Sequence, residues 1–497
     1  MKIITMHHIL GNKVLEYDVD DRGVIVDERE IDRTVNPKPN IADWVKEHMV
    51  FWYDMSKPVD TYSQNFNDWR SHPSVNADII ITSTSFVITR FATLNDTVKC
   101  YIPDQTKNFP GMKVEVKGIV DGQELYWGYS ANVKLVNITS DGTYDIPPLE
   151  TVNGNLSFRN GNIVGACNIT ITQLPSGQSV PTNEILKANP YLQDFSGNNR
   201  PLKLNNFLFA AMSGVGGYEL NWTDQSIWAR FLGSRFNGAI EPHKLTVTSA
   251  LGSFAIMETK VPSYAKKFKV KVSGVIDEIV AYVYTDTKGV QQRFDIREDG
   301  EYELPSNNVV EANFNMGWKI LVNSYPHTCN ITIEQIPSYP NALVTDGVDD
   351  YGQVENLQQG VKVLFVTINP FVDGKSIYDQ RLNTTEPWLF AVFNDKGSIA
   401  YNSRNSNGKT YIDGTLNEST IVSALLNKKQ IITIVNNDVT GDKTKTPVFF
   451  SNTDHDSGWI SSAFYNSIGF DSVPTKETDG FTEQDLINYA LENLITK

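Results

Sequence analysis

Apolar and polar residues alternate along short segments over most of this chain. The period is two in 114–116 and 270–272, where valines flank a charged residue, and longer apolar runs occupy 361–368 and 430–435. A period of two places successive side chains on opposite faces of a β-strand, and short apolar runs between turns suit buried strands. Asp-Gly and Asn-Gly pairs separate many of these segments and favour tight turns. The pattern therefore predicts a mainly β protein built from many short strands.

Three short motifs occur twice in the same order. The first copy holds VEVKGIVD at 114–121, DGTYDIP at 141–147 and CNITI at 167–171, and the second holds VKVSGVID at 270–277, DGEYELP at 299–305 and CNITI at 329–333. Ordered matches at offsets of 156, 158 and 162 residues indicate a duplication with small loop insertions. The sequence predicts two β-sandwich modules of one topology, with Cys167 and Cys329 as buried thiols on equivalent strands.

The end of the chain has the pattern of an amphipathic helix. Thr482 can cap its N-terminus, with Asp485 three residues later completing a capping box. Leu486, Ala490 and Leu494 follow at helical spacing and form one apolar face. A helix with one apolar face is expected to dock onto a sheet.

Three further segments resemble pieces of a known jelly-roll domain. They are FWYD at 51–54, DFSGN at 194–198 and DGVDDY at 346–351. In this order they resemble the entry strands of the concanavalin A-like or laminin-G-like jelly rolls of Bacteroidetes and their phages. The residues that carry the resemblance are Trp52, Asp54, Asp194, Gly197, Asp346, Gly347, Asp349 and Asp350. The resemblance implies one lectin-like jelly roll, with a C-terminal helix, whose pieces are separated by the repeat units.

The repeats and the resemblance divide the chain into six expected segments. These are an N-terminal arm or anchor at 1–44, a first jelly-roll piece at 45–66, the first β-sandwich repeat at 67–177, a second jelly-roll piece at 178–240, the second repeat at 241–337, and the main jelly roll at 338–497. A jelly roll without its first strand would expose an unpaired edge, whereas long loop insertions are tolerated. We therefore expect Trp52, Tyr53, Phe195 and Phe207 to pack against 338–497.

Composition and charge exclude some classes of function. The 497 residues carry a formal charge of −15, which disfavours nucleic acid as a partner because phosphate contacts need clustered Lys and Arg. No apolar run approaches the ~20 residues that span a bilayer, so no membrane insertion is expected. No secretion signal is recognised at the N-terminus. The three cysteines, Cys100, Cys167 and Cys329, form no disulfide framework, and this favours assembly in a reducing cytoplasm.

Two acidic segments raise the question of a metal. Asp346, Asp349 and Asp350 have oxygen ligands of the kind that Ca²⁺ prefers, but they also suit a turn in which they accept backbone N–H bonds. The turn interpretation is favoured, because no loop here has the ligand spacing of a known cage. Asp454 and Asp456 are a second, weaker candidate pair. No organic cofactor is expected.

Two turn-rich segments hold candidate sugar-binding residues. Tyr401, Asn402 and Arg404 lie in one, and Trp459 follows the acidic residues of the other. An aromatic ring stacks on the apolar face of a sugar while neighbouring polar groups bind its hydroxyls. The alternatives are a hairpin turn at 401–405 and a buried Trp459, and these are favoured because most Trp side chains are largely buried.

The resemblance implies a structural and adhesive protein of a phage particle, a head or tail fibre, that presents a carbohydrate-binding jelly roll. Its implied partners are other virion proteins of the capsid or tail, and cell-surface or mucin glycans. The chain is then a homo-oligomer, a trimer by analogy with other fibres, located in the virion and assembled in the host cytoplasm. The alternatives are a glycan-binding protein of the host bacterium and a glycan-degrading enzyme. We expect no enzyme, because the Glu-x-Asp-x-x-Glu pattern of jelly-roll glycosidases is absent.

Overall fold

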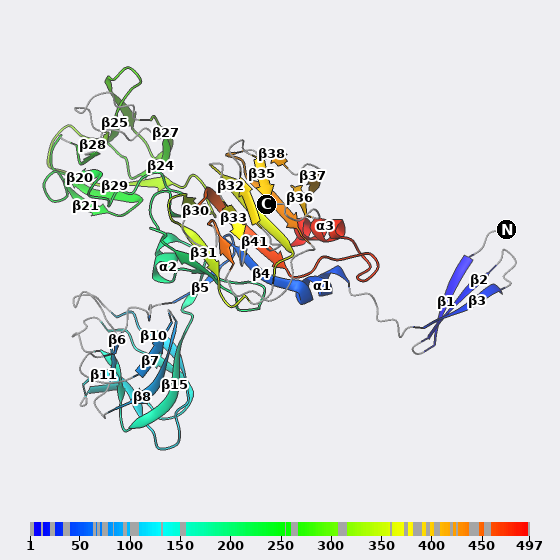
Figure 1. The fold of residues 1–497 in the computed structure, drawn as a ribbon. Helices are drawn as coiled ribbons and strands as arrows, with labels where there is room; N and C mark the ends of the chain where they lie inside the picture. Colours follow the sequence, from blue (N-terminus) through cyan, green and yellow to red (C-terminus); the bar gives the residue numbers. More distant parts are fainter. Residues whose placement is uncertain are drawn as a thin grey trace. The chain divides into compact units, whose positions relative to one another are not determined.

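The fold is mainly β, of the β-sandwich and jelly-roll class, as the sequence pattern predicts (Figure 1). It was obtained as a computed structural model. The described residues are 4–10, 13–19, 25–32, 40–62, 66, 70–71, 78–82, 84–92, 97–99, 109–130, 133–149, 156–253, 255–259, 267–306, 316–357, 360–371, 376–380, 390–393, 398–401, 408–417, 421–423, 426–436, 447–451 and 459–495.

The chain forms two compact units, and each is discontinuous in sequence. The jelly-roll unit comprises Met1–Asp54, Asp194–Leu202 and Gly347–Lys497. The sandwich unit comprises Met55–Gln193 and Lys203–Asp346. Residues far apart along the chain therefore build the domain that the C-terminal segment dominates.

One sheet of the jelly-roll unit contains the longest strands. Its neighbouring strands are, in spatial order, β41 (Ser461–Phe470), β32 (Val363–Pro370), β39 (Gln430–Val435), β36 (Lys409–Ile412) and β37 (Thr415–Asn417), and β4 (Met49–Asp54) also pairs with β41. All the pairings are antiparallel. β32 and β39 lie on the two apolar runs noted in the sequence.

The second sheet of this unit packs against the first. It contains β31 (Tyr351–Val354), β40 (Val448–Phe449), β33 (Ser376–Asp379), β34 (Phe390–Phe393), β35 (Ser398–Tyr401) and β38 (Ile421–Ser423), in that spatial order. Phe51 and Tyr53 of β4 stack on each other at 5.0 Å, and both meet Phe449 of β40 edge-on at 5.9 and 6.1 Å. The aromatic rings of β4 thus fill the core between the two sheets.

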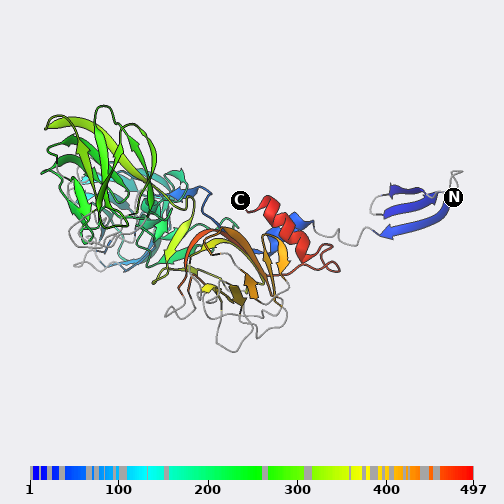
Figure 2. The ribbon, with the colours of Figure 1, turned by 90° about the horizontal axis from the view of Figure 1, so that it is seen from above.

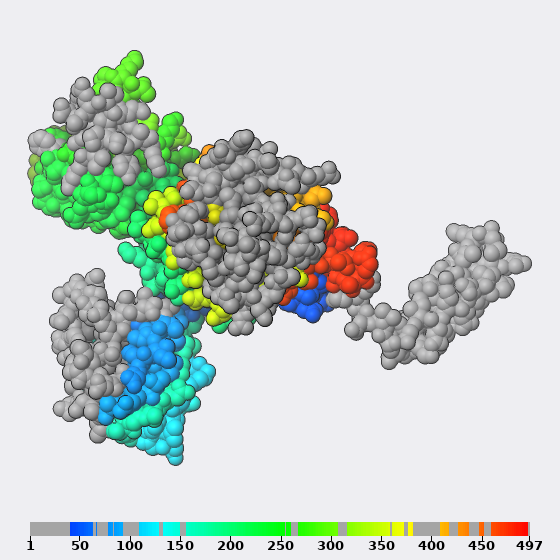
Figure 3. Space-filling model, viewed as in Figure 1, coloured from blue at the N-terminus to red at the C-terminus, as the bar shows by residue number. Residues whose placement is uncertain are grey.

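Two helices cover the other face of the first sheet. α3 (Glu483–Asn493) begins at the N-cap Thr482, and the capping box with Asp485 is present, which confirms that prediction. α1 (Ile41–His48) contributes Trp44, which packs in one apolar cluster with Leu486 of α3 and Phe365 of β32. Figures 2 and 3 show α3, in red, beside α1, in blue. The expected boundary at 44/45 therefore cuts through a helix, because the apolar face of α1 belongs to the jelly roll.

The N-terminal segment forms a small sheet. β1 (Ile4–Leu10), β2 (Lys13–Val19) and β3 (Ile25–Asp32) pair antiparallel in sequence order. The segment expected to be an N-terminal arm or anchor therefore contains a three-stranded meander.

The two repeat units are β-sandwiches with the same strand order. The first contains β6 (Arg70–Ser71), β7 (Asp78–Ile81), β8 (Ser85–Phe91), β9 (Thr97–Lys99), β10 (Met112–Lys117), β11 (Leu125–Ser130), β12 (Val133–Ile138), β13 (Gly142–Ile146), β14 (Ser157–Asn160) and β15 (Gly165–Leu174). The second contains β20 (Trp228–Arg230), β21 (Phe236–Ile240), β22 (Lys244–Ala250), β23 (Met257–Thr259), β24 (Phe268–Ser273), β25 (Ile279–Thr285), β26 (Gln291–Ile296), β27 (Gly300–Leu304), β28 (Gly317–Leu321) and β29 (His327–Ile336). The sheet orders β13–β10–β15–β8–β7 and β12–β11–β14–β9–β6 correspond to β27–β24–β29–β22–β21 and β26–β25–β28–β23–β20. The predicted duplication of one topology is confirmed.

Equivalent glycines make the same close approach in both sandwiches. Gly118 and Gly274 have φ of +92° and +85°, which favours glycine. A Cβ on either would lie 2.0 Å from a backbone carbonyl oxygen, that of Asn168 in one sandwich and Asn330 in the other. The shared glycine is therefore required by the packing of the turn against the long strand.

An aspartate holds each of these turns. The backbone N–H of Ile119 donates to Asp141 at 2.7 Å, and that of Val275 donates to Asp299 at 2.8 Å. The Asp-Gly of the second repeated motif thus supports the Gly of the first, which explains why the two motifs recur together.

The second sandwich begins before its expected start at 241. Trp222, Trp228 and Phe236 are buried in its core, and β20 and β21 complete its two sheets. Trp228 lies on β20 and Phe236 on β21, which are the edge strands of the two sheets, and Trp222 lies in the turn before β20. The first sandwich has β6 and β7 in the same places.

Each sandwich is entered and left through a pair of antiparallel strands. β5 (Val59–Thr61) pairs with β16 (Gly177–Ser179) at the first sandwich, and β19 (Gly214–Val215) pairs with β30 (Leu343–Asp346) at the second. We call these pairs the first neck and the second neck. Between the sandwiches in sequence lie α2 (Asn183–Ala188), β17 (Tyr191–Leu192) and β18 (Leu202–Asn205). Ends that lie side by side suit a domain inserted into a loop.

Candidate functional site

The segment that starts at Asp194 fastens the edge of β4 that faces away from β41. Asp194 Oδ1 accepts the backbone N–H of Trp52 at 2.9 Å, and the N–H of Phe195 donates to the Trp52 carbonyl at 2.8 Å. The Asn198 amide donates to the carbonyl of Met49 at 2.7 Å. These bonds satisfy the backbone groups that an edge strand would otherwise leave unpaired.

The same carboxylate organises the loop that carries it. Asp194 accepts the backbone N–H groups of Ser196 and Arg200 at 2.9 and 3.0 Å, and the Ser196 hydroxyl at 2.9 Å. The Arg200 guanidinium then donates to the Val50 carbonyl at 3.1 Å, and the Tyr53 hydroxyl donates to the Arg200 carbonyl at 2.7 Å. The loop and β4 therefore form one hydrogen-bonded element.

The aromatic residues expected in this region have different positions. Trp52 and Phe195 meet edge to face with their centroids 6.4 Å apart, and Trp52 packs against the apolar cluster under the helices. Gly197, with φ of +86°, lies in the turn that follows Phe195. Phe207 instead belongs to the sandwich unit, where its ring stacks on Phe209 at 5.9 Å. Its expected packing against 338–497 stays a prediction.

The face of the first sheet that α1 and α3 pack against also carries polar residues, on β4, β41 and β32. Asp54 lies opposite Asn466, and Asn466 lies opposite Thr367, on β4, β41 and β32. Directly opposed residues of antiparallel strands share a face. The Thr367 hydroxyl donates to Asn466 Oδ1 at 2.7 Å, and all three residues are no more than 3% exposed. Three neighbouring strands thus place a carboxylate, an amide and a hydroxyl in one row.

A β-bulge adds an aromatic ring to this row. The register of β41 against β32 shifts at Thr367, so that Tyr465 is the extra residue. The Lys429 ammonium lies 4.2 Å from the centroid of the Tyr465 ring. Burial lowers the pKa of Lys429, and the negative charge of Asp54 acts in the opposite direction. The electrostatic influence of Asp54 on Lys429 links the cation to the polar row.

Asn369 completes the group and has an unsatisfied polar atom. It lies two residues beyond Thr367 on β32, so strand alternation places it on the same face. Asn369 is 8% exposed, and its Oδ1 is buried without a hydrogen-bond partner among the described residues. A buried acceptor without a donor is costly and calls for a specific explanation. We call Asp54, Thr367, Asn369, Lys429, Tyr465 and Asn466 the polar patch.

The chemistry of the polar patch suits a polyhydroxyl ligand. Its carboxylate and amides can bind hydroxyl groups, and the Tyr465 ring can stack on an apolar face. Of these residues, the sequence singled out Asp54 alone. Thr367 interrupts the apolar run at 361–368 and Asn369 directly follows it, whereas the positions of Tyr465 and Asn466 depend on the bulge and on a distant strand pairing.

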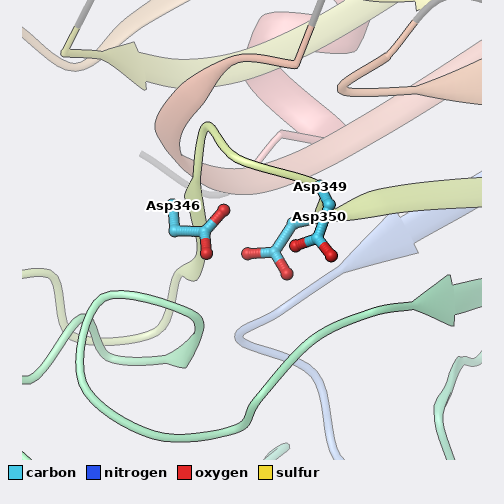
Figure 4. A group of neighbouring side chains, drawn as sticks. All are labelled: Asp346, Asp349 and Asp350. Atoms are coloured by element: carbon cyan, nitrogen blue, oxygen red, sulfur yellow. The ribbon is translucent and has the colours of Figure 1, made fainter. Parts of the chain in front are cut away.

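The acidic turn between β30 and β31 brings its carboxylates together. Oxygens of Asp346, Asp349 and Asp350 lie within 4.8 Å of one another (Figure 4). Gly347 makes the turn with φ of +76°. Each of the three aspartates has a further interaction within the protein, and the turn-capping interpretation stays a prediction. Proximity of acidic groups alone does not establish a Ca²⁺ site, and we assign none.

Most of the expected sugar and metal residues lie outside the described residues. These are the Tyr401 side chain, Asn402, Arg404, Asp454 and Asp456. Trp459 is half-buried, and its indole Nε1 is buried without a hydrogen-bond partner in the described part of the chain. The predicted sugar-binding role of these side chains stays a prediction.

The paired cysteines occupy equivalent places. Cys167 and Cys329 lie on β15 and β29, and each thiol is 3.5 Å from a carbonyl oxygen of the neighbouring strand, that of Ile88 or Val247. Both side chains are half-buried, less than expected, and burial raises the pKa of both thiols. A raised pKa disfavours the reactive thiolate. Cys100 lies outside the described residues.

Comparison with known proteins adds no family. No protein-family model matches the sequence, and no curated protein matches it. Two solved structures of Bacillus subtilis oxalate decarboxylase, one of them a single-substitution variant, are 8% and 9% identical, cover 58% of this chain and 78% of theirs, and have TM-scores of 0.12 and 0.11. Likeness at that level carries no argument about fold or activity. Within the described ranges, no helix is long and apolar enough to cross a membrane.

Proposed function

We propose that this chain is a structural and adhesive protein of a phage particle, a head or tail fibre component, which binds glycans through the polar patch of its jelly roll. The observation that carries glycan binding is the buried Oδ1 of Asn369, which lacks a donor among the described residues. A sugar hydroxyl supplies such a donor, and Asp54 and Asn466 lie on the same face to bind neighbouring hydroxyls. The proposal is of a binding protein and not an enzyme.

The modular construction supports the particle assignment. Two sandwiches of one topology are each inserted between segments of a single jelly-roll chain, through the first and second necks. Repeated modules on one scaffold suit a surface protein. The resemblance of the DFSGN and DGVDDY segments to those of phage and Bacteroidetes jelly rolls points in the same direction, and the N-terminal sheet is the proposed anchor.

Glycan binding is tested with two matched substitutions. Asn369→Leu removes the unsatisfied amide, and Thr410→Val removes another buried oxygen without a partner among the described residues. Thr410 lies on the opposite face, since its neighbour Tyr411 packs in the helix-covered cluster. On an array of host-surface and mucin glycans, Asn369→Leu is expected to lose binding while Thr410→Val retains it. Equal binding by wild type and Asn369→Leu would contradict the assignment of the site.

Two further measurements separate the alternatives. Mass spectrometry of purified virions is expected to find the chain as a stoichiometric component. Its absence from virions, with glycan binding intact, would favour a glycan-binding protein of the host bacterium. Release of reducing ends from a bound glycan, abolished by Asp54→Asn, would favour the enzyme.

A further inference from the structure

A cavity of about 310 Å³ lies at the second neck, within the sandwich unit. It is bounded by the start of α2, by the segment that follows β19, by the turn before β22, and by the segment that follows β29. Proline rings form much of its wall, at Pro181, Pro242, Pro337 and Pro340. The polar patch is in the other unit, so this cavity is separate from the proposed glycan site.

Three polar side chains are held rigidly on the inner wall of the cavity. The rings of Tyr218 and His243 stack with centroids 3.7 Å apart and planes 7° apart. Asn183 is 6% exposed, and its Oδ1 accepts the backbone N–H of Val215 at 2.6 Å. Burial lowers the pKa of His243, which keeps the ring neutral at pH 7. The inner wall therefore offers aromatic and neutral polar surface without a positive charge.

The opening of the cavity is acidic. Glu184, Glu241 and Glu334 line it together with one cation, Lys244, so these four side chains carry a net charge of −2 (three negative, one positive). Burial raises the pKa of Tyr218, and the charges of Glu334 and Glu184 raise it further. The negative potential of the opening therefore reaches the ring on the inner wall.

Among the described residues, the first sandwich has no comparable cavity in the equivalent place. Thr84 is the counterpart of His243, because equivalent strands bond to both residues. The backbone N–H of Gln173 on β15 donates to the Thr84 carbonyl, and that of Gln335 on β29 donates to the His243 carbonyl, each at 2.8 Å. The cavity beside Thr84 is about 40 Å³. A feature confined to one copy of a duplicated module is not required by the fold, and this favours a specific use.

We propose that the cavity at the second neck binds a basic side chain, a Lys or Arg of a partner protein, with its methylene stem against the proline rings and its charged head between the glutamates. Long basic side chains bury their stems on apolar surface while the charge stays near water and counter-charges. The neutral His243 and the stacked Tyr218 complete a wall on which a guanidinium or ammonium can lie. The partner surface is therefore basic, complementary to this acidic opening.

The test uses the full-length protein and small probes that carry the proposed group. Binding of N-acetyl-argininamide and N-acetyl-lysinamide is measured by saturation-transfer NMR, with N-acetyl-norleucinamide as the uncharged analogue and glucosamine as a cationic sugar. The double variant Glu184→Gln/Glu334→Gln is expected to weaken binding of the amino-acid amides about fivefold, since exposed charge pairs contribute modestly. Glu301→Gln, an exposed glutamate of the same sandwich outside the cavity, is the control.

Three outcomes would overturn the proposal. The first is equal binding of the norleucine analogue, which would show that charge is not recognised. The second is an unchanged affinity in the double variant while its melting midpoint matches that of wild type. The third is binding of glucosamine in preference to both amides, which would assign the cavity to an amino sugar. Added salt is expected to weaken the binding of both amides, because the glutamates are exposed.

Discussion

Asp194→Ala is expected to destabilise the jelly-roll unit although the residue lies about 150 positions away from its main segment along the chain. The substitution removes the acceptor for the backbone N–H groups of Trp52, Ser196 and Arg200. It releases the loop whose other bonds reach β4, and β4 would become an exposed edge beside β41.

The magnitude follows from the groups left without a partner. Hydrogen bonds to a charged acceptor contribute about 1.5–3 kcal/mol each, but bonds to one carboxylate are not additive and the site is half-buried. A loss of about 3 kcal/mol in the free energy of unfolding is therefore expected. For a domain of this size that lowers the melting midpoint by about 6–12 °C.

Differential scanning calorimetry of the full-length chain measures the effect, and Asp224→Ala is the matched control. Asp224 accepts the backbone N–H of Ser226 at 2.8 Å and its hydroxyl at 2.6 Å, as Asp194 does with Ser196, but on an exposed turn of the second sandwich. If Asp194→Ala shifts the transition no more than Asp224→Ala, the loop does not stabilise β4 and the reasoning is refuted.

Three other outcomes are expected. A fragment of 338–497 lacks β4, so in circular dichroism melts it should show no cooperative transition at the midpoint of the intact jelly roll; a fragment that melts at that midpoint would refute the discontinuous domain. Gly118→Ala and Gly274→Ala should each destabilise their own sandwich by more than about 2 kcal/mol in urea titrations, because both the φ and the carbonyl contact exclude a Cβ; a neutral effect in either would contradict the packing. Burial raises the pKa of Glu278, but hydrogen bonds from backbone N–H groups and from the His327 ring outweigh burial, so the pKa is lowered overall. The stabilisation of the second sandwich by Glu278 should therefore be complete above the ordinary pKa of 4.5 and be lost as the pH falls through the lowered pKa. Glu278→Gln should flatten that acid dependence, and an unchanged pH profile would count against the pair.

The repeat could be recognised in the sequence because its motifs contain residues that make contacts within their own sandwich. Gly118 and Gly274 are fixed by a carbonyl contact within their own sandwich, and Asp141 and Asp299 by a bond to the next residue after each glycine. These contacts are made with nearby backbone of the same sandwich, so the residues that make them are kept in both copies as recognisable motifs.

The features that the sequence did not reveal depend on distant partners. α1 buries Trp44 against strands more than 300 positions away. The Asn40 cap and the apolar spacing of Trp44 and Val45 are local signals of a helix, but they do not identify the sheet that this helix covers. The polar patch depends on a bulge at Tyr465 and on the register of β4 against β41. Register between segments separated by two inserted domains cannot be read from local periodicity, since one residue of slip reverses every face.

The two necks have a consequence for resistance to proteolysis. A module joined to its neighbours by one linker is lost when a protease cuts that linker once. Each sandwich here is attached through both β5 and β16, or through both β19 and β30, and these strands are paired with each other. One cut in either strand of a neck, or in any loop of a sandwich, leaves that sandwich covalently tethered through the other strand. Shedding a sandwich therefore takes two cleavages, one in each strand of the pair.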